Sequence, residues 1–290
     1  MPRLMTTSMP RTELHYEDTG RGRPVVLVHG WPLSLRMWEG QVNALDAAGY
    51  RCIAYDRRGF GDSGRPAGGF DYDTLASDLN DLMMHLDLQD AVLVGFSMGG
   101  GEVARYLGSY GEGRVSQAVL LGSVTPFLLE STLNGDGLMH PEHFTELRDA
   151  VRKNRIGFLE PFFVDFFTGG PGSEAIDDDL VRYAKSVAWA ASPLATQDCI
   201  MSFGTTDFRA DLVGITIPTL IVHGDSDRIV PLAASAARSH ALIAGSRLEV
   251  LRGAPHGFTE THGTELNGLL LDFIASGSAA PQREARYAIS

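Results

Sequence analysis

Cysteine is scarce in this sequence of 290 residues: Cys52 lies in an apolar, strand-like stretch and Cys199 far from it in a helical-looking stretch. Such isolated cysteines in apolar surroundings are typical of reduced, buried thiols, so we expect no disulfide. Long apolar runs are also missing. No stretch approaches the about 18 apolar residues of a membrane span, and residues 1–20 lack the apolar centre of a signal peptide. We therefore expect a cytoplasmic protein with no membrane partner.

Basic charge is in short supply as well. The 24 Lys and Arg residues are outnumbered by 36 Asp and Glu, which gives a net charge of −12. This balance argues against nucleic acid as a partner, and it would not steer acidic substrates inward. A neutral small-molecule substrate is the expected partner, and the sequence leaves the oligomeric state open. With 44% apolar residues, the chain can bury a large core.

Strands and helices are predicted to alternate along most of the chain. An opening hairpin over 4–9 and 12–18 is followed by strand, helix and strand at 24–28, 34–47 and 50–56, then by helix, strand, helix and strand at 72–88, 91–96, 98–110 and 115–122. The rhythm resumes with a strand at 219–223, a helix at 231–243, a strand at 248–252 and a helix at 259–275. Such alternation predicts a mostly parallel sheet covered by helices.

Between these two parts the strand pattern stops. Residues 125–213 are rich in aromatic side chains and contain no clear buried strand. We interpret this stretch as an inserted helical cap. The predicted domains are thus a core formed by 1–124 and 214–276, the cap at 125–213, and a loose tail at 277–290.

The stretch GFSMGGG at 95–101 follows the apolar strand and opens the next helix. A phosphate loop would need Gly-Lys-Ser/Thr after the glycines, but Glu102 stands there and would repel phosphate. The pattern G-x-S-x-G fits better, because a sharp strand-to-helix turn exposes its serine and requires glycines on either side. Ser97 is therefore the expected nucleophile.

A nucleophilic serine needs a base and an acid. His256 follows the last predicted strand at the edge where open sheets place their chemistry, and His262 is the alternative. Asp227 and Asp225 both follow the strand after the insert, and Asp227 is the expected acid. The alternative role for either carboxylate is structural: it would cap the helix that starts near Pro231. His29 and His223 end strands and are expected to organise loops.

The backbone amides of Trp31 and Met98 are expected to bind a developing oxyanion. Met98 directly follows Ser97 at the start of a helix, and Trp31 lies in the loop after the first long buried strand. Seven side chains are expected to line a substrate pocket, although the cap aromatics among them also suit a core for the cap itself. They are Phe96, Phe127, Phe162, Phe163, Trp189, Ile229 and Phe258.

Taken together, the motifs resemble the α/β-hydrolase superfamily over residues 12–275. They are HGWPLS (29–34), YDRRGFGDSG (55–64), GFSMGGGEVARY (95–106), FGTTDFRADL (203–212), HGDSDRIVP (223–231) and GAPHGF (253–258). More narrowly, the chain is similar to the bacterial cofactor-free haloperoxidases, also described as perhydrolases and arylesterases. The resemblance implies a sheet of about eight strands with a helical cap, a Ser97–His256–Asp227 triad, an oxyanion hole at Trp31 and Met98, and no metal or cofactor.

The expected activity is hydrolysis of small apolar or aromatic esters or lactones through an acyl-serine. In the family that the chain resembles, peroxide can take the place of water and yield a peracid that oxidises halide. A carbon–carbon bond hydrolase, an amidase or lactamase, or a receptor-like ligand sensor would use the same residues. Epoxide hydrolases and haloalkane dehalogenases are disfavoured, because they carry an aspartate where this chain has Ser97.

Overall fold

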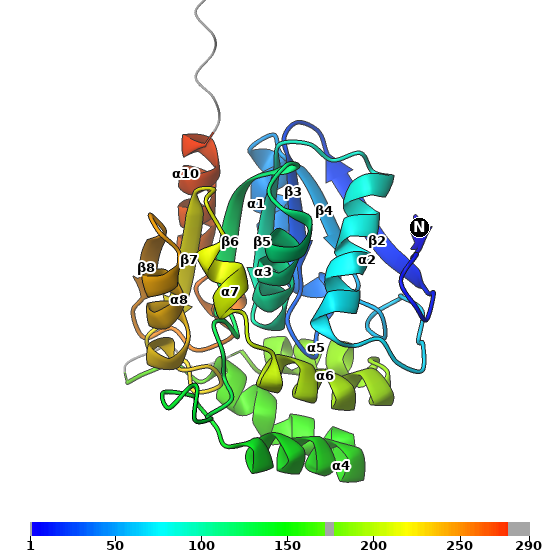
Figure 1. The fold of residues 1–290 in the computed structure, drawn as a ribbon, viewed down its shortest axis with the longest axis vertical. Helices are drawn as coiled ribbons and strands as arrows, with labels where there is room; N and C mark the ends of the chain where they lie inside the picture. Colours follow the sequence, from blue (N-terminus) through cyan, green and yellow to red (C-terminus); the bar gives the residue numbers. More distant parts are fainter. Residues whose placement is uncertain (1, 172–176, 278–290) are drawn as a thin grey trace, which may run out of the picture.

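The computed structural model describes residues 2–171 and 177–277. Within this part of the chain an eight-stranded sheet has the order β1-β2-β4-β3-β5-β6-β7-β8 (Figure 1). The strands are β1 (Arg3–Met5), β2 (Glu13–Gly20), β3 (Pro24–Val28), β4 (Arg51–Tyr55), β5 (Ala91–Phe96), β6 (Val115–Leu121), β7 (Thr219–Gly224) and β8 (Arg247–Leu251). Pairing is antiparallel at β1–β2 and β2–β4 and parallel from β4 to β8. The predicted fold class is confirmed.

The opening hairpin is shorter than predicted. Thr6 N–H donates to Thr12 O at 2.9 Å, which closes a loop between β1 and β2. Side chains in this loop turn away to the helix α2 (Tyr72–His85), where Thr7 and Ser8 bind Asp81 and Asp78. These polar contacts replace the strand pairing that the sequence pattern predicts.

Helices cover both faces of the sheet. The helix α1 (Glu39–Ala47), preceded by the short turn η1 (Leu35–Trp38), packs against α10 (Gly263–Ser276) on one face. On the other face α2 packs against α3 (Met98–Tyr110), and α3 packs against α7 (Arg209–Val213) (Figure 1). The remaining short helices are η2 (Leu232–Ala234), α8 (Ala236–Leu242) and α9 (Phe258–Thr261). Between the two layers every residue of β5 is buried, as a parallel strand covered on both faces requires.

The segment between β6 and β7 forms helices rather than strands. Here α4 (Pro141–Phe167), α5 (Asp178–Trp189) and α6 (Pro193–Thr205) gather below the carboxyl end of the sheet in Figure 1. Non-helical angles at Asn154 (φ −156°, ψ 80°) divide α4 into two arms. We keep the name cap for residues 125–213 as a proposed unit. Of the tail expected at 277–290, all but Gly277 lies outside the described residues.

The turn from β5 into α3 leaves no room for side chains on its glycines. A Cβ on Gly95 would lie 2.4 Å from Gly99 O, and one on Gly99 would lie 2.2 Å from Val28 O. Both neighbours are backbone atoms that cannot rotate away. The two glycines of the G-x-S-x-G pattern are therefore required by close backbone approach.

We expect Gly99→Ala to destabilise the fold by on the order of 1–3 kcal/mol or more, because the added methyl overpacks the sheet edge. Gly113→Ala is the matched control, since a Cβ there meets nothing within 4 Å. Urea denaturation of the two variants measures the difference. Equal stability of both would show that the turn relaxes without cost.

Candidate active site

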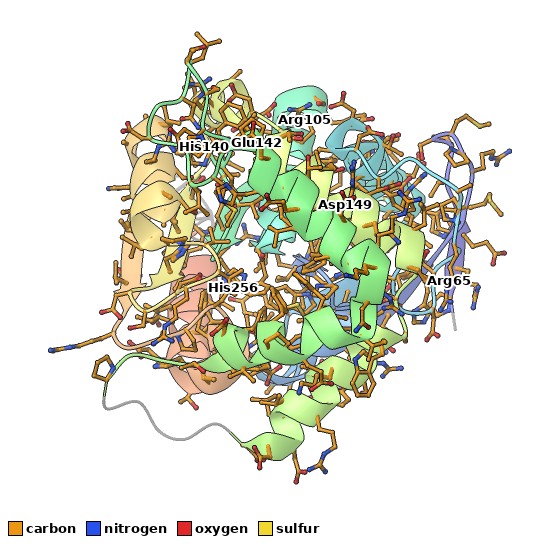
Figure 2. The ribbon with its side chains drawn as sticks, turned by 90° about the horizontal axis from the view of Figure 1, so that it is seen from below. Arg65, Arg105, His140, Glu142, Asp149 and His256 are labelled. Carbon is orange, nitrogen blue, oxygen red and sulfur yellow. The ribbon has the colours of Figure 1, made fainter. Side chains whose placement is uncertain are left out.

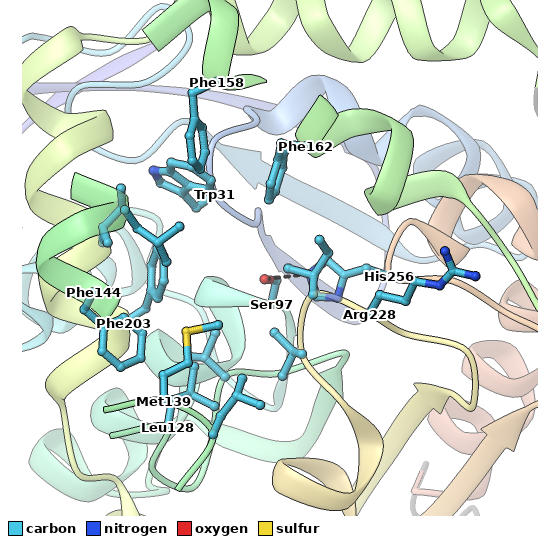
Figure 3. Close-up of a pocket in the computed structure, with 16 residues that line it drawn as sticks. Trp31, Ser97, Leu128, Met139, Phe144, Phe158, Phe162, Phe203, Arg228 and His256 are labelled. Carbon is cyan, nitrogen blue, oxygen red and sulfur yellow. Dashed lines mark hydrogen bonds between the residues drawn. The ribbon is translucent and has the colours of Figure 1, made fainter. Parts of the chain in front are cut away.

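Three polar side chains meet at the carboxyl edge of the sheet. Ser97 directly follows β5, Asp227 lies in the loop after β7, and His256 lies in the loop after β8. Ser97 Oγ lies 2.9 Å from His256 Nε2, and His256 Nδ1 lies 2.6 Å from Asp227 Oδ2 (Figure 3 shows the first contact as a dashed line). Because a carboxylate only accepts, Nδ1 carries the imidazole hydrogen and Nε2 is left to accept from the serine hydroxyl.

The two alternative residues lie elsewhere. The exposed carboxylate of Asp225 accepts hydrogen bonds from Gly253 N–H and the Ser226 hydroxyl, so it ties together the loops after β7 and β8. The ring of His262 contacts the Thr261 hydroxyl. Neither forms a hydrogen bond with Ser97 or His256.

The backbone at Ser97 is strained. Its φ of +54° and ψ of −117° lie in a region that side-chain-bearing residues rarely adopt, at a cost of about 1–3 kcal/mol. Ser97 N–H donates to Leu121 O at 2.8 Å, and Ser97 O accepts from Val124 N–H at 3.2 Å, so the neighbouring strand end holds the conformation. The strain places the hydroxyl over the sheet edge and toward His256.

The Asp227 carboxylate is held ionised in a buried position. Burial alone would raise the pKa of this carboxyl, but His256 and the hydrogen bonds from His223 and His256 outweigh it and hold the pKa well below its usual range. Its second oxygen, Oδ1, accepts from Ile229 N–H at 2.9 Å and Val230 N–H at 2.8 Å. The carboxylate is therefore fixed through both oxygens.

Aromatic rings and a cap segment hold the His256 imidazole. Phe96 lies at a centroid distance of 5.0 Å and Phe166, from α4, packs edge-on at 5.1 Å. Gly257 N–H donates to Phe166 O at 2.7 Å. The end of α4 is thus joined to the histidine loop by both ring packing and a backbone hydrogen bond.

The amides of Trp31 and Met98 have no protein acceptor in the described part of the chain. Met98 is the first residue of α3, where the helix leaves its N–H groups unpaired. The Trp31 indole is fixed separately, because its Nε1–H donates to Thr196 O in α6 at 3.0 Å. Both amides are therefore available to an acceptor near Ser97.

A buried ion pair supports the loop that carries Trp31. Arg57 Nε lies 2.7 Å from Glu102 Oε2, and Arg57 Nη2 donates to His29 O at 2.7 Å. The ring of His29 accepts from Arg57 N–H at 2.9 Å and contacts Gly30 O at 2.8 Å. Burial and the nearby Arg57 lower the pKa of His29, so the ring stays neutral and accepts as this geometry requires. Glu102, which argued against a phosphate loop, thus anchors the neighbouring loop.

Beside Ser97 lies a cavity of about 170 Å³. A dry apolar cavity of roughly 150 Å³ accepts benzene, so this space suits a group of about one aromatic ring. The walls come from the loop after β3, from the cap and from the loop after β7 (Figure 3). They comprise Trp31, Ser97, Val124, Leu128, Leu138, Met139, Phe144, Leu147, Phe158, Phe162, Ile200, Phe203, Arg228, Ile229, Val230 and His256.

Of the seven side chains expected at the pocket, Phe162 and Ile229 line this cavity. The others do not reach it. Phe96 and Phe258 pack behind His256, Phe163 is fully buried inside the cap, Phe127 lies under the Arg209 guanidinium, and Trp189 is 38% exposed on α5.

Three aromatic side chains that line the cavity were not predicted from the sequence: Phe144, Phe158 and Phe203. The sequence signal that could have found Phe144 and Phe158 is the helical spacing of apolar residues on either side of Asn154. The break at Asn154 places both arms of α4 around the cavity (Figure 2 shows the arms with His256 between them).

Another cluster has a composition that could suit a cation. Ligand atoms of His15, Asp56 and Asp62 lie within 4.8 Å of one another. However, both Asp56 oxygens already accept backbone amides, from Leu35 at 2.8 Å and from Asp62 at 2.8 Å. The cluster is therefore explained by the hydrogen bonds with which Asp56 holds neighbouring loops together.

In the described residues, no helix combines the length and apolar character needed to cross a membrane.

Comparison with known proteins agrees with this geometry. Residues 23–262 match the family described as alpha/beta hydrolase fold. The non-heme chloroperoxidase of Kitasatospora aureofaciens is 41% identical over 275 residues, which cover 92% of this chain and 98% of that protein. The bifunctional esterase/perhydrolase of Acinetobacter calcoaceticus is 35% identical over 274 residues, covering 93% and 99%. The crystal structure of bromoperoxidase from Bacillus anthracis superposes with a TM-score of 0.90 at 45% identity, covering 94% and 100%.

The chain therefore belongs to the α/β-hydrolase fold family. It is a hydrolase, and within the family it resembles the non-heme haloperoxidases and the esterases related to them. The resemblance inferred from the sequence motifs is confirmed.

We expect Phe158→Ala to enlarge the cavity, so that butylbenzene raises the melting temperature more than it does in the unaltered protein. Phe163→Ala is the control: it removes a fully buried ring away from the cavity and should cost about 3–5 kcal/mol of stability. Melting curves with benzene or butylbenzene measure the ligand-induced shifts, and melting curves without ligand measure the loss of stability. The same butylbenzene shift in the unaltered protein and the Phe158 variant would remove that ring from the cavity wall.

Proposed function

We propose that the protein is a serine hydrolase that cleaves small apolar or aromatic carboxylic esters and lactones through an acyl-serine intermediate. The observation that carries the proposal is the continuous hydrogen-bonded chain from Ser97 through His256 to Asp227, which opens directly into an apolar cavity. The relatives include a protein described as an esterase/perhydrolase, which supports the same chemistry.

In the proposed mechanism Ser97 attacks the ester carbonyl while His256 Nε2 takes the hydroxyl proton. Asp227 keeps the imidazole hydrogen on Nδ1 and stabilises the imidazolium that forms. The imidazolium then returns its proton to the leaving alcohol, and the acyl group stays on Ser97. Water attacks the acyl-serine with the same histidine as base.

The tetrahedral intermediate requires donors for its oxyanion. The Trp31 and Met98 amides fit this role, because neither has a protein acceptor in the described residues. Met98 follows Ser97 directly in the chain, and Trp31 follows Gly30, where an added Cβ would lie 3.2 Å from Ser97 Cβ. The start of α3 adds the positive end of a helix dipole at the same point. Removal of one donor of this kind typically lowers kcat by a factor of about 10²–10³.

The substrate class follows from the cavity walls. Its lining is almost wholly apolar, and an uncharged ring or short acyl chain would fill it. Apart from Ser97 and His256, the polar lining residue is Arg228, whose guanidinium extends away from the aromatic wall in Figure 3. Polar ends of a substrate are therefore directed toward this side.

Peroxide is proposed as a second acceptor for the acyl group. Attack of hydrogen peroxide on the acyl-serine yields a peracid and regenerates the serine, and the peracid then oxidises halide away from the triad. Relatives described as non-heme chloroperoxidase, bromoperoxidase and esterase/perhydrolase favour this activity. Both activities would share one covalent intermediate.

We expect Ser97→Ala to lower kcat for hydrolysis of a short aryl ester by about 10³–10⁶, because triad members act as a unit. With peroxide present, peracid formation from the same ester should fall by the same factor. Steady-state assays of free acid and peracid measure both. A variant that kept peracid formation but lost hydrolysis would separate the two activities and contradict a shared acyl-serine.

The carboxylates after β7 are expected to respond differently to amide substitution. Asp227→Asn should lower kcat by on the order of 10²–10⁴, because an amide at this position favours the wrong imidazole tautomer. Asp225→Asn, which loosens the contact with Gly253 N–H, should change the melting temperature more than the rate. The comparison needs kcat and melting curves for both variants. A larger rate loss in the Asp225 variant would make Asp225 the acid.

A further inference from the structure

A second buried histidine contacts the carboxylate that holds His256. His223 lies near the end of β7 and is fully buried. Its Nε2 lies 2.7 Å from Val230 O and 3.2 Å from Asp227 Oδ2. Since a carbonyl oxygen only accepts, Nε2 must carry the ring hydrogen. That hydrogen is donated to Val230 O, and the same nitrogen also approaches a carboxylate oxygen of the proposed triad.

The contact closes a ring of polar contacts around the carboxylate. Val230 N–H donates to Asp227 Oδ1 at 2.8 Å, while Val230 O accepts from His223. The backbone N–H and C=O of one residue, Val230, thus tie the imidazole to the carboxylate. The oxygen that His223 approaches, Oδ2, is the same one that accepts from His256 at 2.6 Å. Each imidazole therefore bears on the orientation of the same oxygen.

The other nitrogen of the ring makes the arrangement costly. His223 Nδ1 is buried and has no hydrogen-bond partner in the described part of the chain. Burying an unsatisfied polar atom destabilises a fold, so an apolar side chain of similar size would serve better if only packing mattered. The contacts of Nε2 are the feature that an apolar side chain cannot supply.

We propose that His223 is a positioning residue for Asp227: its Nε2–H fixes the Asp227 carboxylate in the plane that aligns His256 with Ser97. The inference rests on the proposed function, in which Asp227 orients the base. His223 is not among the residues that line the cavity beside Ser97. Its effect on the reaction therefore passes through Asp227.

The test is a double-mutant cycle on ester hydrolysis. His223→Phe removes the donor and keeps the ring volume, and we expect it to lower kcat by about 10- to 100-fold, the range for a hydrogen bond to a charged group, with little change in KM. His223→Gln can place an amide donor near the position of Nε2 and should recover most of that loss. In an Asp227→Ala background, where no carboxylate remains to be positioned, His223→Phe should cost less than about threefold.

A control variant removes a similar histidine elsewhere. His15 is buried, its Nδ1 contacts Asp56 at 3.1 Å, and its Nε2 has no hydrogen-bond partner in the described residues. His15→Phe should change kcat by the same factor with and without Asp227, because Asp56 lies outside the triad. If His223→Phe also has the same factor in both backgrounds, its effect does not pass through Asp227 and the proposal is overturned.

A measurement on the unaltered protein covers the case in which His223→Phe fails to fold. Nitrogen NMR of protein labelled with ¹⁵N-histidine reports which ring nitrogen carries the hydrogen. The proposal requires the Nε2–H form for His223, and a hydrogen on Nδ1 would overturn it, because Nε2 would then present a lone pair to Asp227. Failure of the proposed function looks different: Asp227→Ala alone would leave ester turnover unchanged.

Discussion

The hydrogen bond between His256 Nδ1 and Asp227 Oδ2 joins two loops, and the geometry of the site depends on how those loops are held. They follow β7 and β8, which are neighbours in the sheet, and they are bonded to each other along their length. Ser226 N–H donates to Ala254 O at 3.1 Å, and Gly253 N–H donates to Asp225 Oδ1 at 2.7 Å. Because parallel strands bring their carboxyl ends to one edge, the sheet sets the separation that a 2.6 Å contact requires.

The cap is bonded to the same loop that carries the base. Gly170 N–H donates to Gly253 O, Gly257 N–H donates to Phe166 O, and the Phe166 ring packs edge-on to the imidazole. On the opposite side of the cavity, Trp31 is bonded to Thr196 in α6. The segments that shape the apolar cavity therefore also hold the base and the indole next to the proposed oxyanion amides. A change in the cap is expected to alter substrate choice and the orientation of the base together.

Much of the site could be predicted because strand ends are visible in the sequence. Ser97, Asp227 and His256 each follow an apolar run, and β5 and α3 have the predicted bounds, so the three side chains meet where a parallel sheet would place them. The cavity wall could not be read in the same way. Apolar composition does not show which face of a cap helix turns inward, and the break at Asn154 sets the direction of Phe144 and Phe158. The predicted Phe96 is adjacent to the nucleophile in sequence, yet its ring supports His256 from behind.

Ser97 is expected to carry the acyl group during turnover. Rapid acid quenching within milliseconds of mixing with an aryl ester, followed by peptide mass analysis, measures this. We expect one acyl group on the peptide that contains Ser97, present during the first turnover and absent once the ester is exhausted. An acyl group on a different residue, or ester turnover with no acylated peptide at any time, would show that Ser97 is not the nucleophile.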